Sequence, residues 1–311
     1  MGNVRSQKSA PDGITLPSGR GSEKGRGSAG PPTFAVFTRR ADARRQARRP
    51  APLAFAPLFV LVLAGCAFAQ LPTPNAAGAS AGHDIFSFHD MDAANKFWNT
   101  LGGQPAELGP LKMTKFPGVL FLMRKGDPKG GTKGSTIEYI GFKVKNLKES
   151  LAKCEAAGIT PLPGQTAKQA FLMAPDDVKV RITEDKSLPT PIAMDMVKMV
   201  VPDVAAAEAW YEKWFGAKPI KEGKETVANI PGGNILFAKA EGPVAGTKGR
   251  AFDRIGIEVK DVESLCKNFE ASGIKLDGAY RKATAMNLAV CVLTDPWGTY
   301  IEVSQGLNAV K

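Results

Sequence analysis

An internal repeat constrains the fold of this 311-residue chain more than any other feature. The pattern Pro-Gly, an apolar stretch, the tetrapeptide GTKG and an apolar strand occurs at residues 116–144 and again at 230–259. The two tetrapeptides lie 115 residues apart. A long period of this kind indicates a duplicated structural unit. We therefore expect two similar domains, at residues 83–186 and 194–305, joined by a Pro-Thr-Pro linker at 189–191.

Each of the two halves also repeats within itself. Four amphipathic segments are expected to be helices, because each follows a residue suited to accept the free N–H groups of a helix start. These capping residues are Asp90, Asn146, Asp203 and Asp261. Each helix is expected to end near a glycine, namely Gly102, Gly158, Gly216 or Gly273. Short strands with Gly and Pro punctuation, such as 287–294 and 299–304, follow the helices. The predicted fold class is α+β, with four βαβββ modules of about 55 residues each.

The charge of the chain is concentrated near its start. The formal net charge is +11, but residues 1–70 hold 11 basic and 3 acidic residues, which leaves +3 for the rest. Residues 1–35 are rich in Gly, Ser, Pro and Arg, so we expect them to be disordered. No Met occurs between Met1 and Met91, and one hypothesis is that translation begins at a non-ATG codon near Val36. The balanced remainder gives no basic, aromatic surface pattern for nucleic acid.

Residues 36–69 have the layout of a secretory leader, with six arginines before an apolar run at 53–64. The run is too short to span a bilayer. It ends in Leu-Ala-Gly-Cys at 63–66, which is similar to a lipobox in which Cys66 would be lipidated. Ala-Phe-Ala at 67–69, before Gln70, is similar to an ordinary signal-peptidase site, and both alternatives stay open. We expect an exported protein, periplasmic or held at the membrane by a lipid anchor only, with residues 70–82 as a tether.

The modules resemble those of the vicinal oxygen chelate superfamily, which includes glyoxalases, bleomycin-resistance proteins and extradiol dioxygenases. The resemblance rests on residues 201–216, on 255–261 and on Asp-Pro-Trp-Gly-Thr-Tyr-Ile-Glu-Val at 295–303. It implies cupped mixed sheets whose concave faces bind a ligand. In the enzymes of this superfamily a divalent metal held by His and carboxylate side chains chelates the substrate and acts as a Lewis acid. The fold hosts unrelated chemistries, so it does not specify a reaction.

The resemblance also implies where ligands of a cup would lie. In this superfamily a metal-ligating residue commonly lies on the first strand, seven residues before the capping residue. The corresponding residues here are His83, Tyr139, Met196 and Arg254. The carboxylate of the last strand falls on Glu302, and its equivalent in the first half is Arg181. The first domain would therefore hold His83, Tyr139 and Arg181, and the second Met196, Arg254 and Glu302. A cup that joins His83 to Glu302 across the domains is a less natural alternative.

Neither set is a His-carboxylate triad, and an arginine in a cup would repel a divalent cation. We therefore expect small-molecule binding without a cofactor, with Arg254, Trp297, Tyr139 and Arg181 as ligand-binding candidates. Arg254 and Glu302 are expected to form a structural ion pair, and Tyr139 and three of the tryptophans are expected in the core. Two alternatives stay open for His83, a solvent-facing side chain and a ligand, and His89 is expected at the surface or at a helix start.

Three function classes remain open at this point. The first is a metal-independent binding protein similar to bleomycin-resistance proteins. The second is a metal-dependent enzyme, a glyoxalase-like lyase, an isomerase or an extradiol-type dioxygenase, that uses His83 or Glu302 with non-standard partners. The third is a degenerate scaffold that only dimerises, and the chain is expected to be a monomer or a homodimer. No disulfide can be deduced from the odd set Cys154, Cys266 and Cys291, and we expect buried thiols.

Overall fold

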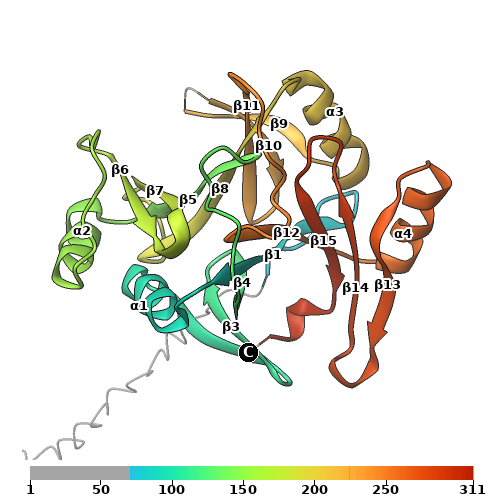
Figure 1. Cartoon of the computed structure of the whole chain (residues 1–311), viewed down its shortest axis with the longest axis horizontal. Coiled ribbons are helices and arrows are strands. Elements are labelled where there is room, and N and C mark those ends of the chain that lie inside the picture. Colours follow the sequence, from blue (N-terminus) through green and yellow to red (C-terminus); the bar gives the residue numbers. More distant parts are fainter. Residues whose placement is uncertain (1–70, 224, 311) are drawn as a thin grey trace, which may run out of the picture. The chain divides into compact units, whose positions relative to one another are not determined.

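The computed structural model describes residues 71–223 and 225–310 (Figure 1). The predictions for 1–35, for the leader at 36–69 and for Cys66 and Gln70 lie outside the described residues. Part of the expected tether belongs to the folded unit, since strand β1 already begins at Ala79. Before it, the Asn75 side-chain amide donates a hydrogen bond of 2.8 Å to the Phe215 carbonyl. The segment 71–78 is therefore held against the folded domain by this hydrogen bond.

Four modules follow one another along the chain, as predicted. The first comprises β1 (Ala79–Phe88), α1 (Met91–Leu101), β2 (Gln104–Leu108), β3 (Leu111–Phe116) and β4 (Val119–Lys125). The second comprises β5 (Ile137–Val144), α2 (Leu147–Ala156), β6 (Gln169–Ala174), the short 3-10 helix η1 (Pro175–Asp177) and β7 (Val178–Glu184). This second module is βαββ and lacks one predicted strand.

The third module comprises β8 (Ile192–Val201), α3 (Val204–Phe215), β9 (Lys218–Glu222), β10 (Glu225–Ile230) and β11 (Gly233–Lys239). The fourth comprises β12 (Phe252–Val259), α4 (Val262–Ala271), β13 (Leu276–Ala283), η2 (Thr284–Met286), β14 (Leu288–Thr294) and β15 (Tyr300–Gln305). A last 3-10 turn, η3 (Leu307–Ala309), ends the described chain. No helix within the described residues is long and apolar enough to cross a membrane.

The helix boundaries confirm the capping prediction. The side chains of all four predicted capping residues accept hydrogen bonds from backbone N–H groups of the first helical turn. Gly102 and Gly216 end α1 and α3 in the left-handed conformation, with φ of 111° and 63°. Only glycine adopts this conformation without a steric penalty, which explains why the helices stop there. Gly158 and Gly273 lie one residue beyond the caps of α2 and α4.

The strands form two mixed sheets, each built from modules of both sequence halves. The eight-stranded sheet has the order β13-β14-β15-β12-β1-β4-β3-β2, so it joins the first and fourth modules. The seven-stranded sheet has the order β6-β7-β5-β8-β11-β10-β9 and joins the second and third. The joints are the antiparallel pairs β1–β12 and β5–β8. The α+β class and the cupped mixed sheets are confirmed, but the sheets do not follow the linear division into 83–186 and 194–305.

The main core lies on the faces of the sheets that the helices cover. Trp98 of α1 is fully buried and packs against Phe121 at 4.9 Å and Phe142 at 6.3 Å between ring centroids, so it touches both sheets. Side chains alternate along a strand, so Phe86 and Phe88 of β1 point into this core while His83 and Ile85 point the other way. The concave face of each sheet is thereby left for a site.

Candidate functional site

Each cup is built from two modules, and strand register identifies one equivalent position on the first strand and one on the last strand of each module. In the fourth module Gly256, two residues after Arg254, lies opposite Glu302. In the first module Ile85, two residues after His83, lies opposite Leu122. The eight-stranded sheet therefore presents His83, Leu122, Arg254 and Glu302 at equivalent positions. By the same register the seven-stranded sheet presents Tyr139, Arg181, Met196 and Leu236.

The predicted site residues are thus grouped differently from our expectation. His83 and Glu302 are 219 residues apart in sequence, yet His83 Nε2 lies 3.1 Å from Glu302 Oε1. The less natural alternative, a cup that joins these two residues, is the one the structure adopts. The reason is the β1–β12 pair, which places the first strand of the chain beside its last module. Tyr139, Arg181 and Met196 meet in the other cup.

Glu302 is the centre of the first cup. Its second carboxylate oxygen, Oε2, accepts a hydrogen bond of 2.8 Å from Arg254 Nη1, which confirms the expected ion pair. Burial by itself would raise the pKa of Glu302, but the hydrogen bond and charge of His83 and the charge of Arg254 outweigh it. The pKa of Glu302 is held at about 2. His83 is only 4% exposed, so it is not a solvent-facing residue.

A second buried carboxylate extends this polar row. Ser304 donates a hydrogen bond of 2.6 Å to Glu258, and Ser304 Oγ lies 3.5 Å from His83 Nδ1. Glu258 also accepts hydrogen bonds from the backbone N–H groups of Gly306 and Leu307, at 2.6 and 3.0 Å. This carboxylate therefore fixes the end of the chain to the floor of the cup. Glu258 was not among the predicted site residues, although the two-residue period along a strand places it on the same face as Arg254.

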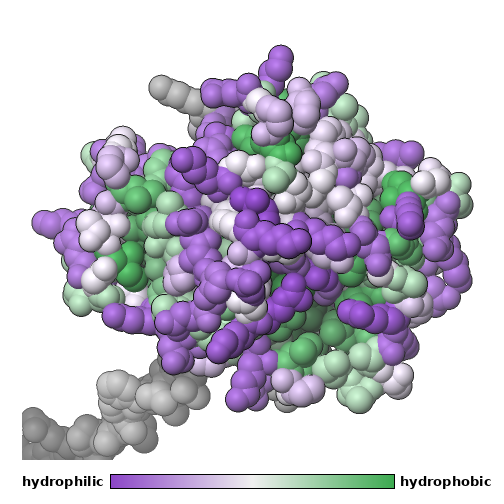
Figure 2. All heavy atoms as spheres, in the orientation of Figure 1, coloured by the Kyte–Doolittle hydropathy of each residue, from purple (hydrophilic) through white to green (hydrophobic). Residues whose placement is uncertain are grey.

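The first cup contains a cavity of about 340 Å³. Ile85, Leu122 and Leu288 are among its apolar walls, and Arg254 and Glu302 lie at its base. A volume of this size is at the lower end of the range for small-molecule sites. Figure 2 shows a hollow with hydrophobic side chains, bordered by hydrophilic ones, where Figure 1 places the gap between β3–β4 and β14–β15.

The second cup is filled by its own side chains. Tyr139, Met196, Val227 and Leu236 form a separate buried apolar cluster on its floor. Arg181 is 6% exposed, and it donates a hydrogen bond of 2.8 Å to the Tyr139 hydroxyl and one of 3.2 Å to Asp195. Burial raises the pKa of Tyr139. The two predicted ligand contacts, Tyr139 and Arg181, are therefore bound to each other and buried.

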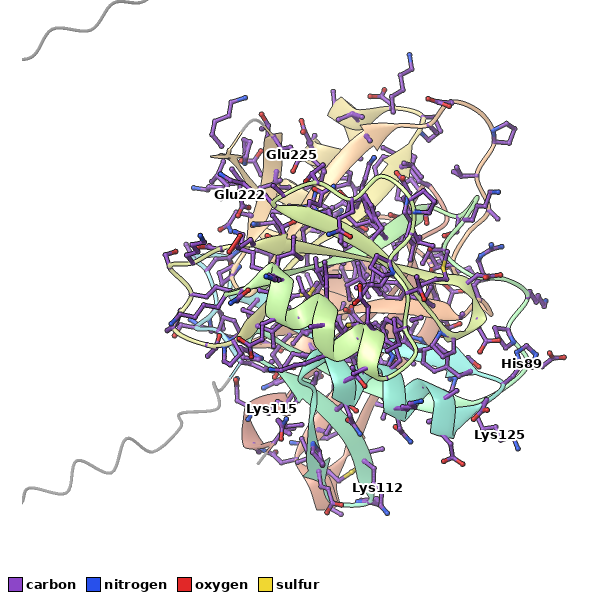
Figure 3. The ribbon with its side chains drawn as sticks, turned by 90° about the vertical axis from the view of Figure 1, so that its left-hand side faces the viewer. His89, Lys112, Lys115, Lys125, Glu222 and Glu225 are labelled. Atoms are coloured by element: carbon purple, nitrogen blue, oxygen red, sulfur yellow. A yellow bond between two sulfur atoms is a disulfide. The ribbon has the colours of Figure 1, made fainter. Side chains whose placement is uncertain are left out.

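Two other predicted positions lie away from the first cavity. Trp297 packs edge-on against Trp210 of α3, with 6.2 Å between ring centroids, and it is not among the residues that line the cavity. The turn that carries it is held by Asp295, whose carboxylate accepts N–H bonds from Trp297 and Thr299. His89 is at the surface, as expected, and contacts Asp127 and Asp176. In Figure 3 it lies at the opposite edge of the molecule from Glu222 and Glu225.

The donor set of the first cup does not match a catalytic divalent ion. Such ions are usually held by three protein side chains of the His, Cys, Asp or Glu types. Of the four equivalent positions only His83 and Glu302 carry such groups, while Leu122 offers no donor and Arg254 brings a positive charge against Glu302. Across residues 71–223 and 225–310 no three His, Cys, Asp or Glu side chains are grouped to hold a metal.

Comparisons with known proteins support the resemblance stated from the sequence. The sequence profile of the Glyoxalase/Bleomycin resistance protein/Dioxygenase superfamily matches residues 193–303. Glyoxalase I from Zea mays has a similar structure, with a TM-score of 0.56 and 15% identity over 74% of this chain and 93% of that one. A Bacillus subtilis protein provisionally called a dioxygenase gives a TM-score of 0.56 and 11% identity over 76% and 86%. None of the curated proteins matches the chain.

The third and fourth modules therefore carry the sequence profile of this superfamily, and the fold of all four modules is similar to that of the two solved structures. At these identities the similar structures establish the fold alone. The resemblance stated from residues 201–216, 255–261 and 295–303 is confirmed, since these segments fall within or at the edge of the matched region.

Proposed function

We propose that the protein binds a small organic molecule in the first cup without the metal triad typical of its superfamily. The observation that carries the proposal is the cavity of about 340 Å³ that ends on the Arg254–Glu302 pair. In this arrangement Arg254 occupies the position equivalent to His83, and its guanidinium neutralises the carboxylate that would otherwise bind a cation. The paired, desolvated groups can orient polar atoms of a ligand, and the apolar walls bind its body.

The alternative is a metal-dependent lyase, isomerase or dioxygenase of the same superfamily. One contact favours it, the 3.1 Å approach of His83 to Glu302, because both side chains are of types that bind metal. Arg254 argues against it, since a divalent ion on Glu302 would have to displace the guanidinium from its 2.8 Å contact.

We infer that the mature protein acts outside the cytoplasm, with Cys66 lipidation and cleavage before Gln70 as the two routes. Besides the leader pattern, a disulfide between Cys266 and Cys291 supports this proposal, because disulfides persist in oxidising compartments. Mass spectrometry of the mature N-terminus distinguishes the routes. A diacylglyceryl Cys66 indicates a lipoprotein, a free Gln70 an ordinary signal peptide, and an intact leader would contradict export.

The binding proposal is tested by a thermal-shift screen of a diverse metabolite library against the purified protein. Leu288→Trp fills the cavity, and Ile220→Trp adds the same bulk on the outer strand β9, where Ile220 is 41% exposed. We expect ligands that stabilise the wild type and Ile220→Trp but not Leu288→Trp. If no compound stabilises the wild type, or if every shift persists in Leu288→Trp, the first cup is not the binding site.

A further inference from the structure

The walls of the first cavity combine an apolar body with an excess of positive charge. Leu111 and Leu122 from the first module and Met286 and Leu288 from the fourth form apolar walls that are partly open to solvent. The charged side chains on the lining are four cations and one carboxylate, namely Arg124, Arg254, Arg281, Lys282 and Glu302. The cavity is therefore both apolar and cationic.

Two of these four cations are already neutralised. Arg254 contacts Glu302 at 2.8 Å and Asp253 at 2.9 Å, and Arg124 contacts the same Asp253 at 3.0 Å. Two carboxylates therefore balance these two arginines. Arg281 and Lys282 form no ion pair with any carboxylate of residues 71–223 and 225–310, so their charges remain available.

Strand register directs Arg281 toward the cavity. Arg281 lies opposite Val290 in the β13–β14 pair, and Ala283 lies opposite Leu288. Residues directly opposite in an antiparallel pair share a face of the sheet. Val290, Ala283 and Leu288 all line the cavity, so Arg281 emerges on the concave face beside them. A guanidinium at this place matches the planar, two-oxygen geometry of a carboxylate.

We propose that the ligand of the first cup is an amphipathic organic carboxylate, whose anionic group pairs with Arg281 and whose apolar body packs on the leucine walls. This assignment rests on the proposed function of the cup as a binding site. A neutral apolar ligand would leave the charge of Arg281 without a partner. A small polar anion would leave the apolar walls in contact with water.

The test is calorimetric titration of the full mature protein with three probes. Octanoate has both the anion and the apolar chain, 1-octanol has the chain only, and propionate has the anion with a short chain. We expect octanoate to bind at least about tenfold more tightly than either of the others, with an affinity that falls as salt is added. The affinity of 1-octanol is expected to be independent of salt.

Arg281→Gln removes the charge from an exposed position on an edge strand, where folding should not depend on it. It should weaken octanoate about tenfold and leave 1-octanol unchanged. Lys148→Gln on α2, exposed and remote from the first cavity, is the matched control and should change neither affinity. Equal binding of octanoate and 1-octanol, or equal binding of octanoate by wild type and Arg281→Gln, would overturn the assignment.

If none of the three probes binds, this ligand class is excluded. The proposed function is then still judged separately by the library screen and the Leu288→Trp variant. If propionate binds as tightly as octanoate, the cup selects the anion alone and the amphipathic assignment fails, while the cup remains a binding site.

Discussion

Glu302 links the charged groups of the first cup, because one of its carboxylate oxygens contacts His83 and the other contacts Arg254. A carboxylate whose pKa is lowered on folding adds stability above its unfolded pKa and loses it as pH falls through its folded pKa. For Glu302 that window runs from the ordinary 4.5 down to about 2. The paired charges therefore stabilise the fold at neutral pH and stop doing so in strong acid.

The first prediction concerns Glu302→Gln. At pH 7 the variant should be less stable than the wild type by about 3 kcal/mol, because Arg254 and His83 lose their shared partner. The difference should shrink as pH falls from 4.5 to 2, as measured by chemical denaturation across that range. Glu263→Gln, in which a half-exposed surface carboxylate is changed, serves as the control and should give a small, nearly constant difference.

Asp84 shows the opposite behaviour on the other face of β1. It is buried in the contact between the two sheets, and burial, opposed by the charge of His83, raises its pKa to about 7. The folded protein holds this proton up to about pH 7, whereas the unfolded chain releases it near 3.8. Stability contributed by the protonated group is therefore lost as pH rises from 3.8 through 7.

The second prediction is that Asp84→Asn stabilises the protein at pH 8, by up to about 4 kcal/mol, and has little effect at pH 4. The amide keeps the shape of the side chain and removes the charge that burial penalises. The measurement is the melting temperature of both proteins over this pH range. A variant that is less stable than the wild type at pH 8 would show that the ionised carboxylate is needed there.

At the scale of elements, the modules could be predicted because their signals are local. Each helix starts at an Asp or Asn cap and ends near a glycine, and these signals survive in all four copies. The missing strand of the second module also has a local cause. Residues 157–168 contain Pro161, Pro163 and Gly164, and a proline cannot donate to a strand ladder. The repeat alone predicts a fourth strand in this module, and these residues interrupt it.

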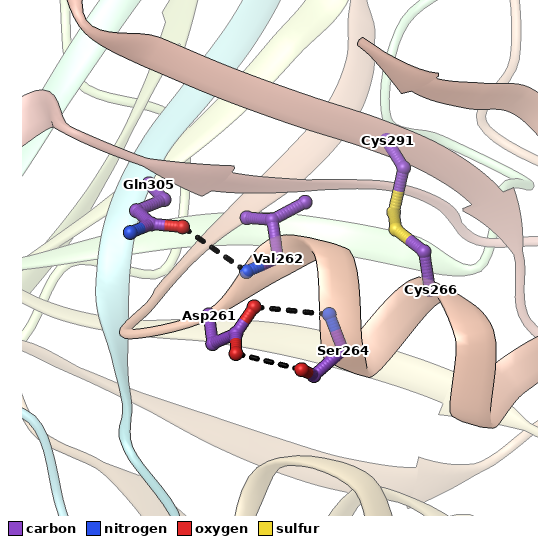
Figure 4. The surroundings of a disulfide bond; sticks show 6 residues. All are labelled: Asp261, Val262, Ser264, Cys266, Cys291 and Gln305. Carbon is purple, nitrogen blue, oxygen red and sulfur yellow. Dashed lines mark hydrogen bonds between the residues drawn. A yellow bond between two sulfur atoms is a disulfide. The ribbon is translucent and has the colours of Figure 1, made fainter. Parts of the chain in front are cut away.

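The disulfide was not predictable from the spacing of the cysteines. Cys266 of α4 and Cys291 of β14 are 25 residues apart and occupy non-equivalent places in the repeat. They meet because α4 packs across β14, as Figure 4 shows. Our expectation of buried thiols is correct for Cys154, which is free and buried, and wrong for the other two.

The third prediction follows from this crosslink. Closing a loop of this length lowers the entropy of the unfolded chain, so the double variant Cys266→Ala, Cys291→Ala should be less stable by about 3 kcal/mol. Reductant should lower the melting temperature of the wild type toward that of the variant. Reductant should not change the melting temperature of the variant. A wild-type melting temperature that reductant also leaves unchanged would contradict a disulfide between these residues.

At the scale of the whole molecule, the pairing of modules decides which residues meet. His83 and Arg254 could be found by counting from the helix caps, and Glu302 from the last-strand motif, but their partners could not. Every module offers the same edge of its first strand, and a sequence repeat does not say which two edges pair. The short connection at 185–191 brings β8 beside β5, which leaves β1 to pair with β12.

The fourth prediction tests this pairing directly. Residues 71–189 and 190–311 each contain modules whose sheet partners lie in the other piece. Expressed alone, neither half should be a folded monomer, because long strand edges would be unpaired. Expressed together, the halves should form a 1:1 complex on size exclusion. Two independently folded monomeric halves would instead support the linear domains 83–186 and 194–305.

The most direct test of the central claim is the metal content of the purified protein after incubation with excess Fe²⁺, Mn²⁺, Zn²⁺ or Ni²⁺ and removal of unbound ions. We predict a content far below one ion per chain for each metal, identical in the wild type and in Glu302→Gln. A stoichiometric ion in the wild type that is lost in Glu302→Gln and in His83→Ala would contradict the metal-free cup. That result would favour the metal-dependent enzyme.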